Sequence, residues 1–278
     1  QKIIDQIKPD FFFFDHENKS VKKLFSKQGV TCINYRKIRK LKKKKINLKK
    51  YIKKINLNNI AFIYFTSGST GDPKGIKISH KNIISDVFLQ KKHLYNNSTN
   101  NLIFGDYYDT AFSIFFDIYF PAIFFGSIIC PAQKRQEVFL PISHVEKNNV
   151  NILVCVPSTI QRIKDYYKNI DIKHQFKILI LTGEPFFLNL LNYMFEKLKF
   201  EKLYNCYGAT EMGNLVFYHR CNKNDVKSYK KYNLVPIGKK FPNIRTQIIN
   251  GELVIQGPMI SQGYLNENTV TLAEVLKD

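Results

Sequence analysis

The segment from Tyr64 to Gly75 has the residue types that a polyphosphate-binding loop requires. It reads Y-F-T-S-G-S-T-G-D-P-K-G, so an apolar run leads into three glycines, four hydroxyl side chains and one lysine. Glycines let backbone N–H groups approach phosphate oxygens closely, hydroxyls donate further hydrogen bonds, and the lysine adds positive charge. The segment departs from the Walker A pattern because Asp72 and Pro73 precede the lysine. A plain Ser/Gly turn, the alternative, explains the glycines but not the hydroxyls beside a lysine.

Three further segments carry candidate functional residues. Gly183-Glu184-Pro185 follows an apolar run, and residues 205–211 read N-C-Y-G-A-T-E. Residues 251–265 read G-E-L-V-I-Q-G-P-M-I-S-Q-G-Y-L and lead into Asn266. Taken alone, residues 205–211 also fit a strand followed by a tight turn with a surface glutamate. Glycine and proline mark turns in any β-rich region, so we assign the last segment no catalytic role.

These four segments, in this order, resemble the signature motifs of the adenylate-forming superfamily. That superfamily contains acyl-CoA synthetases, luciferases, D-alanine–carrier ligases and the adenylation domains of nonribosomal peptide synthetases. The resemblance implies an ATP-dependent acid–thiol ligase that converts a carboxylic acid to its acyl-adenylate and releases pyrophosphate. ATP and Mg²⁺ are the implied cofactors, and CoA or the phosphopantetheine thiol of a carrier protein is the implied acceptor. A non-catalytic nucleotide-binding relative is the alternative.

The resemblance also implies roles for individual residues. Asn205 would lie near the edge of adenine and Tyr207 would stack on it. Thr210 would contact the α-phosphate, and Glu211 would help to bind Mg²⁺, which prefers carboxylate oxygens. Lys74, Thr210 and Glu211 are the implied catalytic residues. The residues implied to hold the β- and γ-phosphates are Thr66, Ser67, Gly68, Ser69, Thr70, Gly71 and Lys74.

Short apolar runs that alternate with longer amphipathic ones predict an α/β fold with helices layered on a sheet. The predicted strands are residues 11–15, 30–34, 60–66, 151–156, 177–182 and 202–206. The predicted helices are residues 79–93, 141–148, 158–167 and 185–198. Beyond about Leu215, residues 235–238, 245–249 and 252–256 predict a smaller, antiparallel β-rich region. Residues 112–132 predict a buried helix that runs into a buried strand, because Asp117 and Pro121 argue against a membrane span.

By resemblance, residues 1–278 are a partial AMP-binding (adenylation) domain, truncated at both ends. The superfamily has a ribose-binding aspartate and a small C-terminal domain with a catalytic lysine after the stretch that Leu265 ends here. We do not assign Asp278 the role of that aspartate, because no Thr-Gly precedes it. The expectation is that this fragment alone binds nucleotide but is inactive or nearly so.

The identity of the acid depends on residues 108–126. Amino-acid-activating members carry a stretch like FDxSxxDIFxPLLxG, and here Asp117-Ile118-Tyr119 and Pro121 fit its second half. The aspartate that would bind a substrate ammonium aligns near Phe112 or Ser113, and Asp109 is a displaced candidate that also fits a simple loop residue. An amino acid is the preferred substrate, since Pro236-Ile237-Gly238 and the GYLN ending favour an amino-acid or carrier-protein ligase. A fatty-acyl or aryl-CoA ligase is the alternative.

Composition excludes several classes. The 44% apolar content is enough for a core, and the five scattered cysteines contain no CxxC pair and no metal-ligand cluster with histidines, which favours reduced thiols in a cytoplasmic protein. No signal peptide or membrane span is predicted. The net charge of +21 is concentrated in residues 36–54, which predict a solvated, lysine-rich connection. A nucleic-acid-binding module is the alternative for that stretch, although no recognition motif accompanies it.

Overall fold

The structure is a computed structural model that describes residues 2–14, 19–38, 52, 55–66, 72–167 and 172–265. Most of the basic stretch 36–54 and the five residues 67–71 of the predicted phosphate loop lie outside the described residues. Within the described ranges, none of the helices combines the length and the apolar composition that a membrane span requires.

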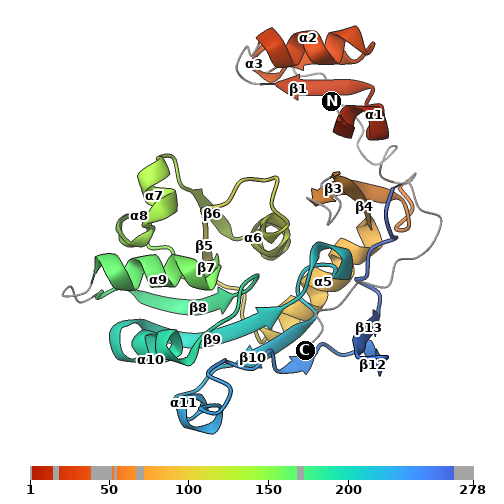
Figure 1. Cartoon of the computed structure of the whole chain (residues 1–278). Helices are drawn as coiled ribbons and strands as arrows, with labels where there is room; N and C mark the ends of the chain where they lie inside the picture. Colours follow the sequence, from red (N-terminus) through yellow and green to blue (C-terminus); the bar gives the residue numbers. More distant parts are fainter. Residues whose placement is uncertain are drawn as a thin grey trace.

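The chain begins with a small α/β unit and a β-hairpin (Figure 1). In the first unit, strands β1 and β2 pair in parallel, and in the hairpin β3 pairs with β4 in antiparallel register. The elements of these parts are α1 (Lys2–Ile7), β1 (Phe11–Phe14), α2 (Lys19–Lys27), β2 (Thr31–Asn34), α3 (Tyr35–Ile38), β3 (Ile60–Thr66) and β4 (Lys74–Ser79).

A seven-stranded sheet forms the body, in the order β11-β10-β9-β8-β7-β5-β6. Strands β9, β8, β7, β5 and β6 are parallel, while β10 runs antiparallel to both β9 and β11. The strands are β5 (Ile103–Asp106), β6 (Ile128–Pro131), β7 (Ile152–Cys155), β8 (Gln175–Leu181), β9 (Lys199–Tyr207), β10 (Phe217–Arg220) and β11 (Lys239–Lys240). A separate hairpin of β12 (Arg245–Ile249) and β13 (Glu252–Gln256) follows.

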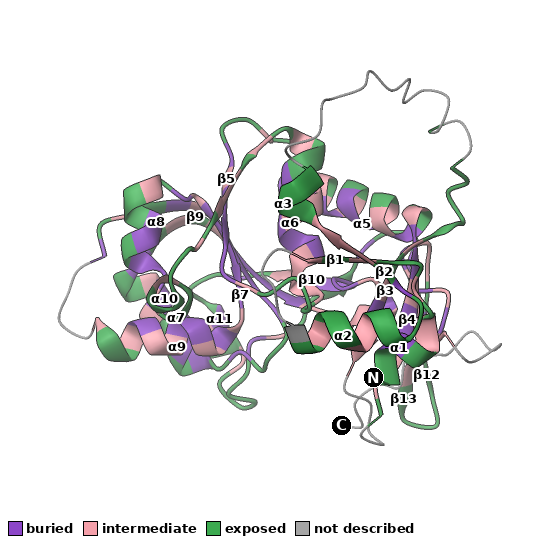
Figure 2. Cartoon of the chain, turned by 90° about the horizontal axis from the view of Figure 1, so that it is seen from above, coloured by how far each residue is buried: buried purple, intermediate pink, exposed green. Residues whose placement is uncertain are grey.

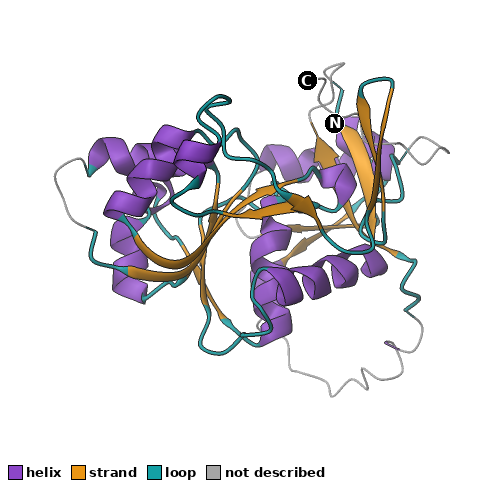
Figure 3. Cartoon of the chain, turned by 90° about the horizontal axis from the view of Figure 1, so that it is seen from below, coloured by secondary structure: helices purple, strands orange, loops and turns teal. Residues whose placement is uncertain are grey.

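Helices cover both faces of the sheet (Figure 3). They are α5 (His80–His93), α6 (Ile114–Phe125), α7 (Arg135–Phe139), α8 (Ile142–Asn148), α9 (Pro157–Tyr166), α10 (Leu188–Lys197), the 3₁₀ turn η1 (Thr210–Met212) and α11 (Asp225–Ser228).

The two apolar clusters of the core follow from the alternation of side chains along each strand. Val154 of β7 lies in one cluster with Ile118 of α6. Leu153, its neighbour in sequence, lies in the other with Ile160 of α9 and Leu191 of α10. Figure 2 shows this buried layer running through the strands. Both faces of the central strands β7 and β8 are therefore buried, which explains their nearly continuous apolar sequences.

The layered α/β fold predicted from the sequence is confirmed, with corrections at particular elements. Residues 235–238 are not a strand, because the Asn205 side chain donates to the carbonyls of Val235 and Pro236 and Pro236 has no N–H to give a ladder. The helix predicted over 185–198 begins only at Leu188, since the Phe186 carbonyl accepts from the N–H of Val235. The segment 128–131 is a strand, but it is half-exposed at the sheet edge rather than buried.

Candidate active site

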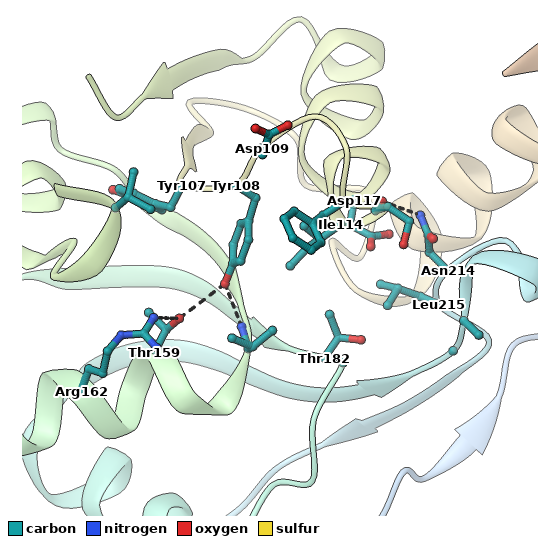
Figure 4. Close-up of a pocket in the computed structure, with 17 residues that line it drawn as sticks. Tyr107, Tyr108, Asp109, Ile114, Asp117, Thr159, Arg162, Thr182, Asn214 and Leu215 are labelled. Atoms are coloured by element: carbon teal, nitrogen blue, oxygen red, sulfur yellow. Dashed lines mark hydrogen bonds between the residues drawn. The ribbon is translucent and has the colours of Figure 1, made fainter. Parts of the chain in front are cut away.

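A cavity of about 600 Å³ opens where the parallel strands end (Figure 4). Its wall includes residues 107–109 after β5, Val156 after β7, 182–183 after β8 and 208–209 after β9. The beginning of α6 forms another part of the wall. In open α/β sheets, ligands bind in the crevice outside the carboxyl ends of the strands. The cavity is therefore where the fold class places a substrate, and it adjoins the segment 205–211.

Gly208 sets the path of the chain from β9 into the cavity wall. A Cβ at this position would lie 1.4 Å from the carbonyl oxygen of Asn214, so only glycine lets the two backbone segments come this close. Asn214 in turn donates from its side chain to the carbonyl of Ser113, at 2.9 Å. This contact ties the turn after β9 to the start of α6.

Thr210 and Glu211 lie in the 3₁₀ turn that follows Gly208. The hydroxyl of Thr210 donates to the hydroxyl of Ser113 at 3.0 Å. The Glu211 side chain accepts from the hydroxyl of Tyr264 at 3.1 Å, and its backbone carbonyl accepts from the N–H of Ser261. Both side chains are half-buried.

Lys74 lies at the start of β4, the strand that follows the predicted phosphate loop, and reaches the same tyrosine, Tyr264. Its ammonium lies 5.1 Å from the centre of the Tyr264 ring, a cation–π arrangement. Tyr264 forms an isolated bridge with Ile76, and the N–H of Leu265 donates to the carbonyl of Gly75. The segment 262–265 thereby pairs with the edge of β4. Of the predicted catalytic residues, Lys74 lies over the ring of Tyr264 and Glu211 binds its hydroxyl.

The base of the predicted phosphate loop is a strand pair. Thr66 at the end of β3 is opposite Lys74 at the start of β4. Ser67, Gly68, Ser69, Thr70 and Gly71 lie outside the described residues, so their role as phosphate ligands stays a prediction.

The two predicted adenine-contacting residues, Asn205 and Tyr207, differ in how far they are buried. Asn205 is 4% exposed, and its amide donates to the carbonyls of Val235 and Pro236, so its side-chain nitrogen holds the segment between α11 and β11. Tyr207 is half-buried at the end of β9, where burial raises the pKa of its hydroxyl. Neither predicted nucleotide contact is tested by this geometry, and both stay predictions.

Glu184, in the segment 183–185, binds the start of helix α9. Its carboxylate accepts from the backbone N–H of Ser158 at 2.8 Å and from the Ser158 hydroxyl at 3.0 Å. A carboxylate at a helix N-terminus satisfies N–H groups that have no partner within the helix. The neighbouring Gly183 has φ of +85°, which favours glycine.

Polar groups lie at opposite sides of the cavity (Figure 4). On one side, Arg162 donates to the hydroxyl of Thr159 at 2.9 Å, and the Tyr108 hydroxyl accepts from the N–H of Val156. On the other side lies Asp117, which is 1% exposed. Asp109 is exposed and accepts from the N–H of Ala111, which supports its interpretation as a loop residue.

Ser113, Asn214 and Tyr264 are site residues that the sequence did not single out for a role. Ser113 lies in the stretch 108–126 but received no role there, Asn214 belongs to no recognised pattern, and only the fold brings the two together. Tyr264 lies in the recognised GYLN stretch, but nothing in the sequence indicated that it would contact Lys74 and Glu211.

A second group of candidate ligands lies in the loop after β10. Side-chain atoms of His219, Cys221 and Asp225 all lie within 4.8 Å of one another, which corrects the expectation that no cysteine would cluster with a histidine. Asp225 already accepts from His219 and from the backbone and side chain of Asn222. These hydrogen bonds give the buried Asp225 carboxylate a structural role, because they hold the turn after β10 in place.

All five cysteines are free, as predicted for reduced thiols. Burial raises the pKa values of Cys155, Cys206 and Cys221, which makes these three thiols poor nucleophiles. The cysteines therefore contribute packing rather than chemistry.

A family model described as AMP-binding enzyme matches residues 1–265. Among curated proteins, bacitracin synthase 1 of Bacillus licheniformis is 26% identical over 237 residues, and tyrocidine synthase 3 of Brevibacillus parabrevis is 28% identical over 233 residues. These matches cover 79% and 77% of this chain and 4% of each relative. The chain thus spans a small part of the length of these relatives.

Two solved structures share the fold. The Vibrio cholerae adenylation domain AlmE, in complex with glycyl-adenosine-5'-phosphate, gives a TM-score of 0.77 at 20% identity, over 96% of this chain and 56% of that one. The o-succinylbenzoate coenzyme A synthetase of Bacillus subtilis, in complex with ATP and magnesium ion, gives 0.75 at 17% identity, over 96% and 55%.

Proposed function

Because the chain belongs to the family of AMP-binding enzymes, we propose that it contributes the main ATP- and acid-binding part of an enzyme that adenylates a carboxylic acid. A carboxylate oxygen attacks the α-phosphorus of ATP, the bond from that phosphorus to the bridging oxygen of the β-phosphate breaks, and pyrophosphate leaves. The product is an acyl-adenylate, a mixed anhydride that then acylates a thiol. The observation that carries the proposal is the cavity at the strand ends, beside Lys74, Thr210 and Glu211.

The chain's own residues supply position and charge, which dominate phosphoryl and nucleotidyl transfers. Lys74 would offset the negative charge of the phosphates, and the Thr210 hydroxyl, held by Ser113, would donate to an oxygen of the α-phosphate. The acyl part would occupy the cavity between α6 and the ends of β7 and β8.

Glu211 suits a role as a Mg²⁺ ligand. One of its oxygens accepts from Tyr264, and in the part of the chain that the structure describes Glu211 forms no ion pair, so a carboxylate oxygen stays free for a hard cation. Bound there, Mg²⁺ would neutralise charge on the phosphates and on the leaving pyrophosphate.

An amino acid is the preferred substrate within this proposal. Support comes from the peptide synthetases among the relatives, from the adenylation domain with a glycyl adenylate among the similar structures, and from the buried carboxylate of Asp117 in the cavity wall. The thiol acceptor would then be the phosphopantetheine of a carrier protein, with CoA as the alternative.

Acid-dependent ATP–pyrophosphate exchange by the complete protein that contains this chain tests the proposal. We expect exchange that falls by about 100-fold or more in Lys74→Ala, because a charge opposite the phosphates is lost. Lys77→Ala is the matched control, since residues 74 and 77 of one strand point to opposite faces. ATP binding without exchange for any acid would instead support the non-catalytic relative, and exchange with fatty or aryl acids alone would overturn the amino-acid preference.

A further inference from the structure

Asp117 is a buried carboxylate in the wall of the cavity at the strand ends, where the acid substrate is proposed to bind. It has no cationic partner among the described residues. Its Oδ1 accepts from the side-chain amide of Gln90 at 2.9 Å. The same amide nitrogen donates to Oδ2 of Asp86, also at 2.9 Å. Two buried carboxylates of α5 and α6 therefore share one neutral donor.

The electrostatics of this pair favour a cationic ligand. Burial raises the pKa of Asp117 to about 8, and burial together with the charge of Asp117 raises the pKa of Asp86 well above its usual range. A carboxylate that has lost its hydration is costly to ionise unless a cation compensates it. An ammonium group in the cavity would supply that cation.

The geometry also indicates where the ammonium must lie along the substrate. On the proposed function, the reacting end of the acid lies near Thr210, whose hydroxyl contacts Ser113 at the start of α6. Asp117 follows Ser113 by four residues, which is about 6 Å along a helix and on the same face. An amine at Asp117 is thus separated from the activated carboxyl group by several bonds.

We propose that this cavity selects an ω-amino acid, whose ammonium binds Asp117 while its carboxylate reaches the reaction centre; the inference rests on the proposed function. Asn214, in the same wall, has a buried amide oxygen with no hydrogen-bond partner within the described ranges, and it is a second acceptor for the ammonium. Apolar side chains of Ile114 and Leu215 line the space for the methylene chain (Figure 4).

The test compares 5-aminopentanoate, pentanoate and 2-aminopentanoate in ATP–pyrophosphate exchange by the complete protein. We expect kcat/KM to favour 5-aminopentanoate over both other acids by about 10- to 100-fold, the range of a charge-assisted hydrogen bond. Asp117→Asn, which preserves shape and can still bond Gln90, should abolish that preference, so that kcat/KM for 5-aminopentanoate falls to about the value for pentanoate. Asp86→Asn is the matched control, because Asp86 shares the network but does not line the large cavity, and it should keep the preference.

A preference for 2-aminopentanoate, or an equal loss for all three acids in Asp117→Asn, overturns the inference. Asp117→Glu provides a second variant, whose longer side chain should move the optimum to 4-aminobutyrate. Calorimetric measurement of 5-aminopentanoate binding distinguishes a failure of the proposed function from a failure of the ammonium site at Asp117. Absence of exchange with every acid refutes the proposed function, whereas binding that Asp117→Asn abolishes supports the ammonium site, and binding that it leaves unchanged overturns it.

Discussion

The hydroxyl of Tyr264 donates a 3.1 Å hydrogen bond to the carboxylate of Glu211, and the ring of the same tyrosine lies 5.1 Å from the ammonium of Lys74. One side chain near the end of the described chain therefore holds the predicted metal ligand and faces the predicted phosphate ligand. Its backbone is fixed by the bridge to Ile76.

Tyr264→Phe should separate these two contacts, because it removes the hydroxyl and keeps the ring. We expect exchange activity to fall by about 3- to 30-fold and the Mg²⁺ concentration for half-maximal activity to rise, since Glu211 loses an orienting hydrogen bond. Tyr232→Phe is a suitable control, because Tyr232 is an exposed tyrosine that also has a lysine over its ring. An unchanged Mg²⁺ dependence would show that the hydroxyl does not position Glu211.

Gly208→Ala should disrupt the turn between β9 and the cavity. The added Cβ would meet the backbone oxygen of Asn214, which cannot move without breaking the contact of Asn214 with Ser113. We expect a loss of about 3 kcal/mol or more in the free energy of unfolding, measured by urea denaturation. Gly251→Ala, where φ is +81° but no atom lies within 4 Å of the added Cβ, should cost only about 1–2 kcal/mol from backbone strain. Equal losses in the two variants would refute the steric argument.

Asp117→Asn should change the pH dependence of stability. Burial raises the pKa of Asp117 from 3.8 to about 8, so between these values the folded chain keeps a proton that the unfolded chain has released. Rising pH then favours unfolding by up to about 1.4 kcal/mol per pH unit, and this contribution levels off above pH 8. Asparagine does not titrate, so the variant should gain stability relative to the parent as pH rises.

Urea denaturation at about pH 5 and about pH 8 measures this difference. Asp86 is present in both proteins, but without the charge of Asp117 its pKa is raised less in the variant, which further reduces the stability that the variant loses as pH rises. A stability difference between variant and parent that is the same at both values of pH would contradict the prediction.

Asn205→Ala should destabilise the chain even without nucleotide. The substitution leaves the carbonyls of Val235 and Pro236 without their donor, at a cost of about 1–3 kcal/mol. Asn192→Ala, which removes an exposed asparagine bonded to Glu196, should change stability by less than about 0.5 kcal/mol. If thermal melting of the nucleotide-free chain is the same for both variants, the Asn205 side chain does not contribute to stability.

The sequence predicted the elements with long apolar or amphipathic runs, and it missed those whose pattern is short or charged. Strand β4 reads K-G-I-K-I-S and β10 reads F-Y-H-R, and neither run is long enough to stand out. Strand β4 forms because it pairs with β3 and with the segment at Tyr264, which are tertiary contacts. Local propensity carries no information about such pairing.

The candidate site shows the same division. The motif residues Lys74, Thr210 and Glu211 were predicted from the sequence, and the fold brings Lys74 and Glu211 to one tyrosine. The contact between Ser113 and Thr210 joins residues 97 positions apart, and the pairing of two carboxylates through Gln90 joins α5 to α6. These contacts depend on how the helices pack on the sheet, so no sequence pattern predicts them.

The bridge between Ile76 and Tyr264 sets an order of events during synthesis. The two residues are about 190 positions apart, and a ribosome adding roughly 5–20 residues per second needs on the order of ten to forty seconds to cover that distance. For that interval the strand after the predicted phosphate loop has one free edge, while the parallel strands between β5 and β9 emerge in sequence and can already pair. The edge of β4 therefore closes only after the parallel strands have emerged, and while it is exposed a stalled chain would be open to mispairing there.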